Sequence, residues 1–108
     1  MYEYKAIVTN VVDGDTIDAE VDLGFHLNAT LRFRLLGVDC PERGQEGYAA
    51  AKEFVEQAVL GQHVTVKTKK GDSFGRWLCV VQYDAEGEFP KDLQAELIKA
   101  GLATAFKG

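Results

Sequence analysis

Residues 33–42 read Phe-Arg-Leu-Leu-Gly-Val-Asp-Cys-Pro-Glu. Arg34 lies within an apolar pattern typical of a strand, and the carboxylates of Asp39 and Glu42 come where this strand is expected to end. Pro41 lies between the two acids and bends the chain. A cation for a phosphate, an oxygen ligand for a metal and a base for water are the groups that a phosphate-cleaving site needs. A core strand has no use for these charges, so we look for function first in this segment.

Apolar and polar residues alternate on both sides of this run, which is typical of β-strands. We expect five strands, over residues 4–12, 16–23, 29–38, 63–69 and 76–83. The turn signal at residues 13–15, Asp-Gly-Asp, predicts a hairpin between the first two strands. The buried face of the second strand is expected to consist of Ile17, Ala19, Val21 and Leu23. In the third strand, Leu31, Phe33 and Leu35 are expected to face the core.

Two helices are predicted between and after these strands. The first covers Gln45 to Leu60, where apolar residues recur at helical spacing, and Gly61 ends it. The second follows Asp92, a suitable N-cap, and stops at Gly101. The element order is therefore β-β-β-α-β-β-α. This order is typical of the OB-fold, a five-stranded barrel with two helices in the α+β (mainly β) class, and an open α+β sheet is the alternative.

Length and charge restrict the functions that this chain can perform. Its 108 residues fit a single domain over residues 1–108. The formal net charge is −5, so bulk attraction does not bring a polyanion to the protein. Any activity on nucleic acid must therefore rest on a local basic site, with or without a metal.

The two cysteines are too few for a disulfide framework, and with two histidines they lack the spacing of a zinc site. Cys79 stands in an apolar strand pattern and is expected to be a buried thiol. Near the N-terminus there is no signal-peptide pattern, and no apolar stretch approaches the length of a membrane span. We expect a cytoplasmic protein with no membrane partner, and export as part of a longer precursor is left open.

Three segments carry the chemistry: residues 13–16 (Asp-Gly-Asp-Thr), residues 34–42, and residues 72–76 (Asp-Ser-Phe-Gly-Arg). In their order and spacing they resemble the staphylococcal nuclease (thermonuclease-like) family. The middle segment, Arg-Leu-Leu-x-x-Asp-x-Pro-Glu, is specific, whereas Asp-Gly-Asp alone commonly marks a hairpin turn. The resemblance runs from about Lys5 to about Phe106, which is nearly the whole chain.

The resemblance implies a Ca²⁺ site. Asp15 and Asp39 would bind the ion through carboxylate oxygens, the backbone carbonyl of Cys40 would be a third ligand, and waters would complete the shell. The family has threonine where Cys40 stands, and a main-chain ligand tolerates that change. Asp13 and Thr16 would orient the metal and its waters.

The resemblance also implies the catalytic residues and the reaction. Glu42 would be the general base that takes a proton from the attacking water. Arg34 and Arg76 would grip the scissile phosphate. The family's reaction hydrolyses phosphodiester bonds of DNA or RNA and leaves a 3′-phosphate and a 5′-hydroxyl. We expect a preference for single strands or frayed ends.

The sequence departs from the family around the substrate. Ser73 and Phe74 stand where familiar members have a lysine and a tyrosine, so Phe74 would offer a ring face to the substrate. Lys69 and Lys70 are further candidate substrate contacts. The family's third helix has no counterpart before Gly108, and we expect either a monomer with a more polar barrel wall or a homodimer that covers the exposed surface.

Two alternative functions are open. One is an inhibitor or assembly domain that merely retains the fold, and the other is a binding module. An OB-fold module that has lost catalysis would bind nucleic acid or protein without cleaving it. Such modules are expected to lose the metal or phosphate ligands, whereas this chain keeps all five of the principal residues, Asp15, Arg34, Asp39, Glu42 and Arg76. Three aromatic residues are expected to be core or packing residues rather than a platform for stacking bases: Phe74, Trp77 and Tyr83.

Overall fold

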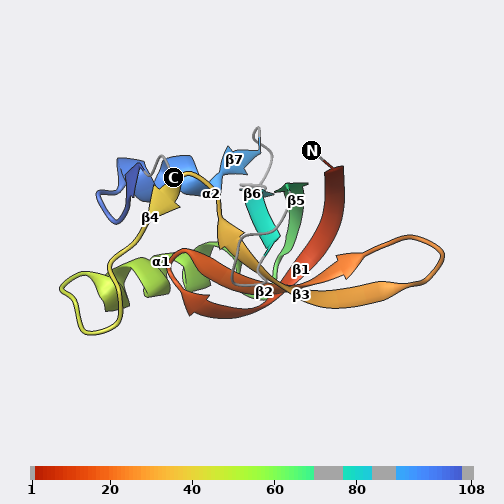
Figure 1. The fold of residues 1–108 in the computed structure, drawn as a ribbon, viewed down its shortest axis with the longest axis horizontal. Coiled ribbons are helices and arrows are strands. Elements are labelled where there is room, and N and C mark those ends of the chain that lie inside the picture. The colour runs from red at the N-terminus through yellow and green to blue at the C-terminus, as the bar shows by residue number, and fades with distance from the viewer. Residues whose placement is uncertain (1, 70–76, 84–89, 106–108) are drawn as a thin grey trace.

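The computed structural model describes residues 2–69, 77–83 and 90–105. Its centre is a barrel of five long strands (Figure 1): β1 (Tyr2–Asp13), β2 (Thr16–Asp22), β3 (Asn28–Leu35), β5 (His63–Lys69) and β6 (Trp77–Tyr83). Neighbouring strands are antiparallel in the order β3-β2-β1-β5-β6. A parallel pairing of β3 with β6 closes the barrel, and Phe33 lies opposite Trp77 there. The predicted mainly-β, OB-type barrel is confirmed.

Two helices and three short strands complete the described fold. The helices are α1 (Tyr48–Val59) and α2 (Leu93–Lys99), and the short strands are β4 (Val38–Asp39), β7 (Lys91–Asp92) and β8 (Thr104–Ala105). β4 pairs with β8, and β7 extends the barrel sheet beside β6. Neither of the described helices has the length and apolarity needed to cross a membrane.

The core lies inside the barrel and under α1, and the predicted alternation explains it. Ile17, Ala19 and Val21 on β2 are buried, as are Phe33 and Leu35 on β3. The helix adds the buried residues Ala51, Val55 and Val59. Full burial of each large apolar side chain stabilises the fold by about 1.5–3 kcal/mol.

Two of the expected core residues are exposed. Leu23 is 45% exposed because β2 ends at Asp22, and the β2–β3 hairpin extends beyond the barrel on the side away from α1 (Figure 1). Trp77 is 44% exposed at the start of β6, so its prediction as a packing residue is wrong. Tyr83, at the other end of β6, does pack against the core.

The strand predicted for residues 29–38 is broken in two. β3 ends at Leu35 and β4 begins at Val38, with Gly37 between them at a φ of 82°, a conformation that glycine adopts without strain. Nη1 of Arg34 donates to the Leu35 carbonyl at 2.7 Å and to the Val38 carbonyl at 2.8 Å. The guanidinium therefore bridges both sides of the turn and holds the break in place.

The first helix begins at Tyr48 rather than at Gln45. Gly47 precedes it with a φ of 91°, so the backbone before Tyr48 is not helical. The second helix follows the prediction more closely, because the Asp92 carboxylate accepts hydrogen bonds from the backbone of Gln94 at 3.0 Å and Ala95 at 3.3 Å.

The tip of the β2–β3 hairpin contains strained backbone. Phe25 and His26 have φ values of 55° and 61°, and the Leu27 amide donates to the Gly24 carbonyl at 2.9 Å across them. Asn-Gly is the pair that suits a hairpin turn with two positive φ angles, whereas a bulky aromatic residue is strained there. The Phe25 ring is 94% exposed and gains little burial in return.

We predict that replacing Phe25 with Asn and His26 with Gly stabilises the protein. Relief of left-handed strain is worth about 1 kcal/mol per residue, which corresponds to a rise in Tm of several degrees. Leu27→Asn is the matched control, because it also removes an exposed apolar side chain, yet at a residue without positive φ. Thermal unfolding followed by circular dichroism checks this. A double variant with unchanged or lower Tm contradicts the strain argument.

Candidate active site

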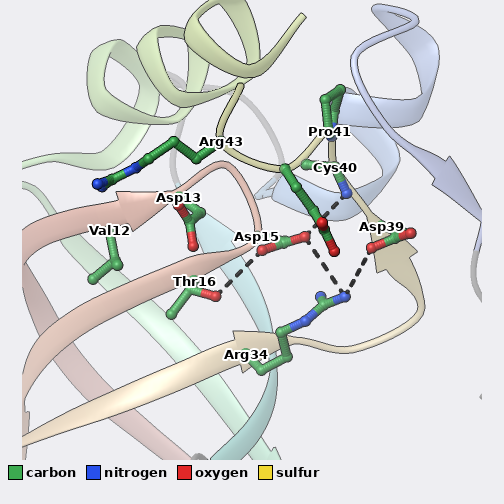
Figure 2. Close-up of a pocket in the computed structure, with 10 residues that line it drawn as sticks. Val12, Asp13, Asp15, Thr16, Arg34, Asp39, Cys40, Pro41 and Arg43 are labelled. Atoms are coloured by element: carbon green, nitrogen blue, oxygen red, sulfur yellow. Dashed lines mark hydrogen bonds and ion pairs between the residues drawn. The ribbon is translucent and has the colours of Figure 1, made fainter. Parts of the chain in front are cut away.

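A cavity of about 460 Å³ lies where the β1–β2 turn meets the segment that follows β3 (Figure 2). It is lined by Val12, Asp13, Asp15, Thr16, Arg34, Asp39, Cys40, Pro41, Glu42 and Arg43. Two of the three chemistry-bearing segments of the sequence thus meet at one cavity. Lys69 is the last residue of β5, and Lys70, Phe74 and Arg76 lie outside the described residues.

Arg34 is held by acceptors on both sides of its guanidinium. Nη1 is fixed by the two carbonyls of the turn. Nη2 lies 3.4 Å from Oδ1 of Asp39 and 3.6 Å from Oδ2 of Asp15 (Figure 2). The Arg34 side chain is only 14% exposed. One cation therefore brings two carboxylates that are far apart in sequence to the same point of the cavity.

Asp15 is buried and its two carboxylate oxygens are both engaged. Oδ1 accepts from the Thr16 hydroxyl at 3.2 Å, and Oδ2 accepts from the Cys40 amide at 3.0 Å. The backbone is also fixed, because the Leu35 amide donates to the Asp15 carbonyl at 2.8 Å. The orientation of this carboxylate is therefore set by three segments of the chain.

Asp39 differs from Asp15 in its environment. It lies in the short strand β4, whose pairing with β8 places it opposite Thr104. Its side chain is 56% exposed, so its carboxylate keeps coordination capacity toward the cavity and solvent. Asp39 therefore combines a fixed backbone with an accessible side chain.

The donor set suits a hard cation. Among residues 2–69, 77–83 and 90–105, no group of three or more His, Cys, Asp or Glu side chains is arranged to hold a metal ion. Two carboxylates facing one guanidinium nitrogen nevertheless supply oxygen ligands of the kind that Ca²⁺ prefers, with waters or main-chain carbonyls to complete the shell. Thiolate ligation is disfavoured, since burial and the negative charge of Asp15 raise the pKa of the Cys40 thiol to about 12.

Two residues that support the site were not recognised as such in the sequence. The Tyr48 hydroxyl donates to Oδ1 of Asp13 at 2.8 Å, which connects the first turn of α1 to the end of β1. Oε1 of Gln45 accepts from the backbone amide of Glu42 at 2.7 Å. The sequence offered little signal for either contact, because Tyr48 belongs to the apolar helical stripe and Gln45 reads as the start of the helix.

The family model described as staphylococcal nuclease homologue matches residues 32–107. The chain belongs to the staphylococcal nuclease family. The protein ParB of Escherichia coli and the micrococcal nuclease of Shigella flexneri are each 31% identical to it over 109 residues, which cover 97% of this chain. The endonuclease Htp3 of Saprolegnia parasitica is 29% identical over 93% of the chain.

The staphylococcal nuclease match covers two of the three segments that suggested the family. Residues 34–42 and Arg76 lie within the matched range, and the β1–β2 turn precedes it. The aligned part makes up 59% of the length of ParB, 60% of that of the micrococcal nuclease and 54% of that of the endonuclease. The chain therefore spans just over half the length of the relatives it matches.

Gly14 permits the close approach on which the site depends. A Cβ at this position would meet the Cβ of Ala51 at 2.9 Å, closer than real Cβ atoms come, and Sγ of Cys40 at 3.0 Å, which is a tight contact. The β1–β2 turn therefore packs directly on α1 and on the segment that carries Asp39.

We predict that Gly14→Ala lowers the free energy of unfolding by about 1–3 kcal/mol, the usual cost of overpacking. Ala51→Gly removes the nearest clashing atom, at the cost of about 1 kcal/mol for glycine in a helix. The double variant should therefore lose less stability than the two single variants added together. Urea unfolding of the four proteins measures this, and strictly additive losses or a neutral Gly14→Ala contradict the packing argument.

Proposed function

We propose that this chain is a Ca²⁺-dependent nuclease that hydrolyses phosphodiester bonds of DNA, RNA or both, with single strands preferred. The observation that carries the proposal is the placement of Arg34, with one guanidinium nitrogen facing Asp15 and Asp39 inside a cavity that Glu42 also lines. Family membership supports it, since two of the aligned relatives are named as nucleases. Residues 1–108 would form one nuclease domain.

Arg34 and Arg76 would bind the scissile phosphate. A guanidinium matches two phosphate oxygens at once and keeps its charge at any physiological pH. Because carbonyls already fix Nη1 of Arg34, its Nη2 edge is pre-oriented and loses little freedom when a phosphate arrives. Charge that accumulates on the phosphate oxygens in the transition state is then stabilised without reorganisation of the protein.

Asp15, Asp39 and the Cys40 carbonyl would hold the Ca²⁺ ion, and Thr16 and Asp13 would orient its surroundings. Thr16 already donates to Asp15, and Asp13 is held by Tyr48. A bound Ca²⁺ supplies positive charge beside the phosphate and makes nearby water more acidic. With Asp15 and Asp39 engaged as ligands, their attraction for Arg34 would be weaker, and its Nη2 would be available to a substrate phosphate.

Glu42 would act as the general base. It is exposed, it lines the cavity, and its backbone amide is fixed by Gln45. A carboxylate in this place would take a proton from the water whose oxygen bonds to phosphorus as the P–O5′ bond breaks. The departing 5′-oxygen takes a proton from solvent, which gives a 5′-hydroxyl, and the phosphate stays on the 3′-oxygen. Phe74, Lys69 and Lys70 remain proposed contacts to neighbouring parts of the substrate.

We predict that the wild-type chain cleaves a single-stranded DNA oligonucleotide in millimolar Ca²⁺ and stops when the ion is chelated. Glu42→Gln should lower turnover by roughly 10²–10⁴-fold, the range for loss of a general base, while oligonucleotide binding persists. Glu46→Gln is the matched control: Glu46 is an exposed glutamate of the same loop that does not line the cavity. Product ends are read by mass spectrometry.

Two outcomes contradict the proposal. Turnover of Glu42→Gln close to that of Glu46→Gln removes Glu42 as the base. Binding of the oligonucleotide without any Ca²⁺-dependent cleavage by the wild-type chain identifies a non-catalytic OB-fold module instead.

A further inference from the structure

Arg43 lines the same cavity as Arg34 from another side. Figure 2 shows Arg43 beside Val12 and Asp13 at the end of β1, whereas Arg34 lies below Asp15 and Asp39. The two guanidiniums thus reach the cavity from different segments and at different places. A ligand that extends from Asp39 toward Asp13 would meet both of them.

The two arginines differ in what they bind within the protein. Arg34 is engaged with two carbonyls and two carboxylates and is mostly buried. Arg43 is exposed, and none of the described residues accepts a hydrogen bond from it or forms an ion pair with it. Within the described part of the chain, Arg43 is therefore the cavity cation whose donors are still available.

The backbone fixes the position of Arg43. The Gln45 amide donates to the Glu42 carbonyl at 2.9 Å, which closes a four-residue turn over residues 42–45. Gly44 has a φ of 91°, the positive value that a type II turn requires at its third residue. Oε1 of Gln45 also accepts from the Glu42 amide at 2.7 Å. Arg43 thus occupies the second position of a turn that two hydrogen bonds stabilise, and it directly follows Glu42, the proposed base.

Negative charge predominates in the lining of the cavity. Among the described lining residues there are four carboxylates, those of Asp13, Asp15, Asp39 and Glu42, against two guanidiniums. The chain as a whole carries a net charge of −5, so it does not attract a polyanion from a distance. A polynucleotide needs local cations at more than one of its phosphates, and guanidinium forks are suited to that contact.

We propose that Arg43 forms a second phosphate subsite, which binds a backbone phosphate next to the scissile one and so favours polynucleotides over ligands with a single phosphate. This inference rests on the proposed function, because the scissile phosphate is placed at Arg34. Arg43 adds affinity for the polynucleotide and fixes where the polynucleotide lies along the cavity. Glu42, on the same turn, is thereby aligned with the bond to be cut.

The test measures binding of a fluorescent single-stranded oligonucleotide by anisotropy, in Ca²⁺, with Glu42→Gln as the parent protein. Adding Arg43→Gln should weaken binding about 10-fold, the effect of losing one charge-assisted hydrogen-bonded contact. The slope of log affinity against log salt should become shallower by about 0.7, one phosphate contact on a single strand. Arg43→Lys should restore the slope and only part of the affinity, because it keeps the charge without the fork.

Two comparisons make the result specific. For a dinucleoside monophosphate, which has one phosphate, Arg43→Gln should change affinity less than twofold. Lys99→Gln removes the same charge from the last turn of α2, away from the cavity lining, and should leave oligonucleotide binding within twofold of the parent.

The inference is overturned if Arg43→Gln weakens both ligands equally, if it weakens neither, or if Lys99→Gln has the same effect. Failure of the proposed function looks different: the wild-type chain then cleaves nothing, while oligonucleotide binding and its dependence on Arg43 persist.

Discussion

The site depends on one guanidinium that is shared between the backbone and two carboxylates. Arg34 donates to the carbonyls of Leu35 and Val38, and these bonds hold the turn that ends β3 and begins β4. The same group faces Asp15 on the β1–β2 turn and Asp39 on β4. Removing a buried cation of this kind leaves carbonyls and carboxylates without their partner, which is costly in a partly buried place. Local structure and the chemistry of the cavity are therefore set by the same side chain.

The fold of the barrel sets the positions of Asp15 and Asp39. The turn that carries Asp15 can approach α1 only because Gly14 has no side chain to clash with Ala51 and Cys40. Asp39 follows a strand that closes the barrel against β6, and its short strand pairs with β8. The backbones of Asp15 and Asp39 are thus fixed by packing and strand pairing, as a site that must hold oxygen ligands in place requires.

Much of the barrel could be predicted from the sequence, because the alternation of apolar and polar residues indicates which face of a strand is buried. The break at residues 36–37 could not, since Leu36, Gly37 and Val38 continue the apolar pattern and only the contacts of Arg34 reveal the turn. Leu23 fits the alternation too, yet the hairpin has left the barrel by that point, and the residue is 45% exposed. Arg34, Asp39 and Glu42 could be predicted from their spacing at the end of a strand, and Asp15 from the resemblance to the family. The support from Tyr48 and Gln45 depends on how α1 packs, which no local pattern encodes.

The central claim is that the fork of Arg34, and not merely its positive charge, organises the site. The most direct test is the turnover of Arg34→Lys on single-stranded DNA in saturating Ca²⁺, with folding checked by near-ultraviolet circular dichroism. A lysine ammonium is a point charge that cannot bridge two carbonyls and face two carboxylates at once, so turnover should fall by roughly 10²-fold or more in a folded protein. Turnover within a few-fold of wild type would show that charge alone suffices and would contradict the account.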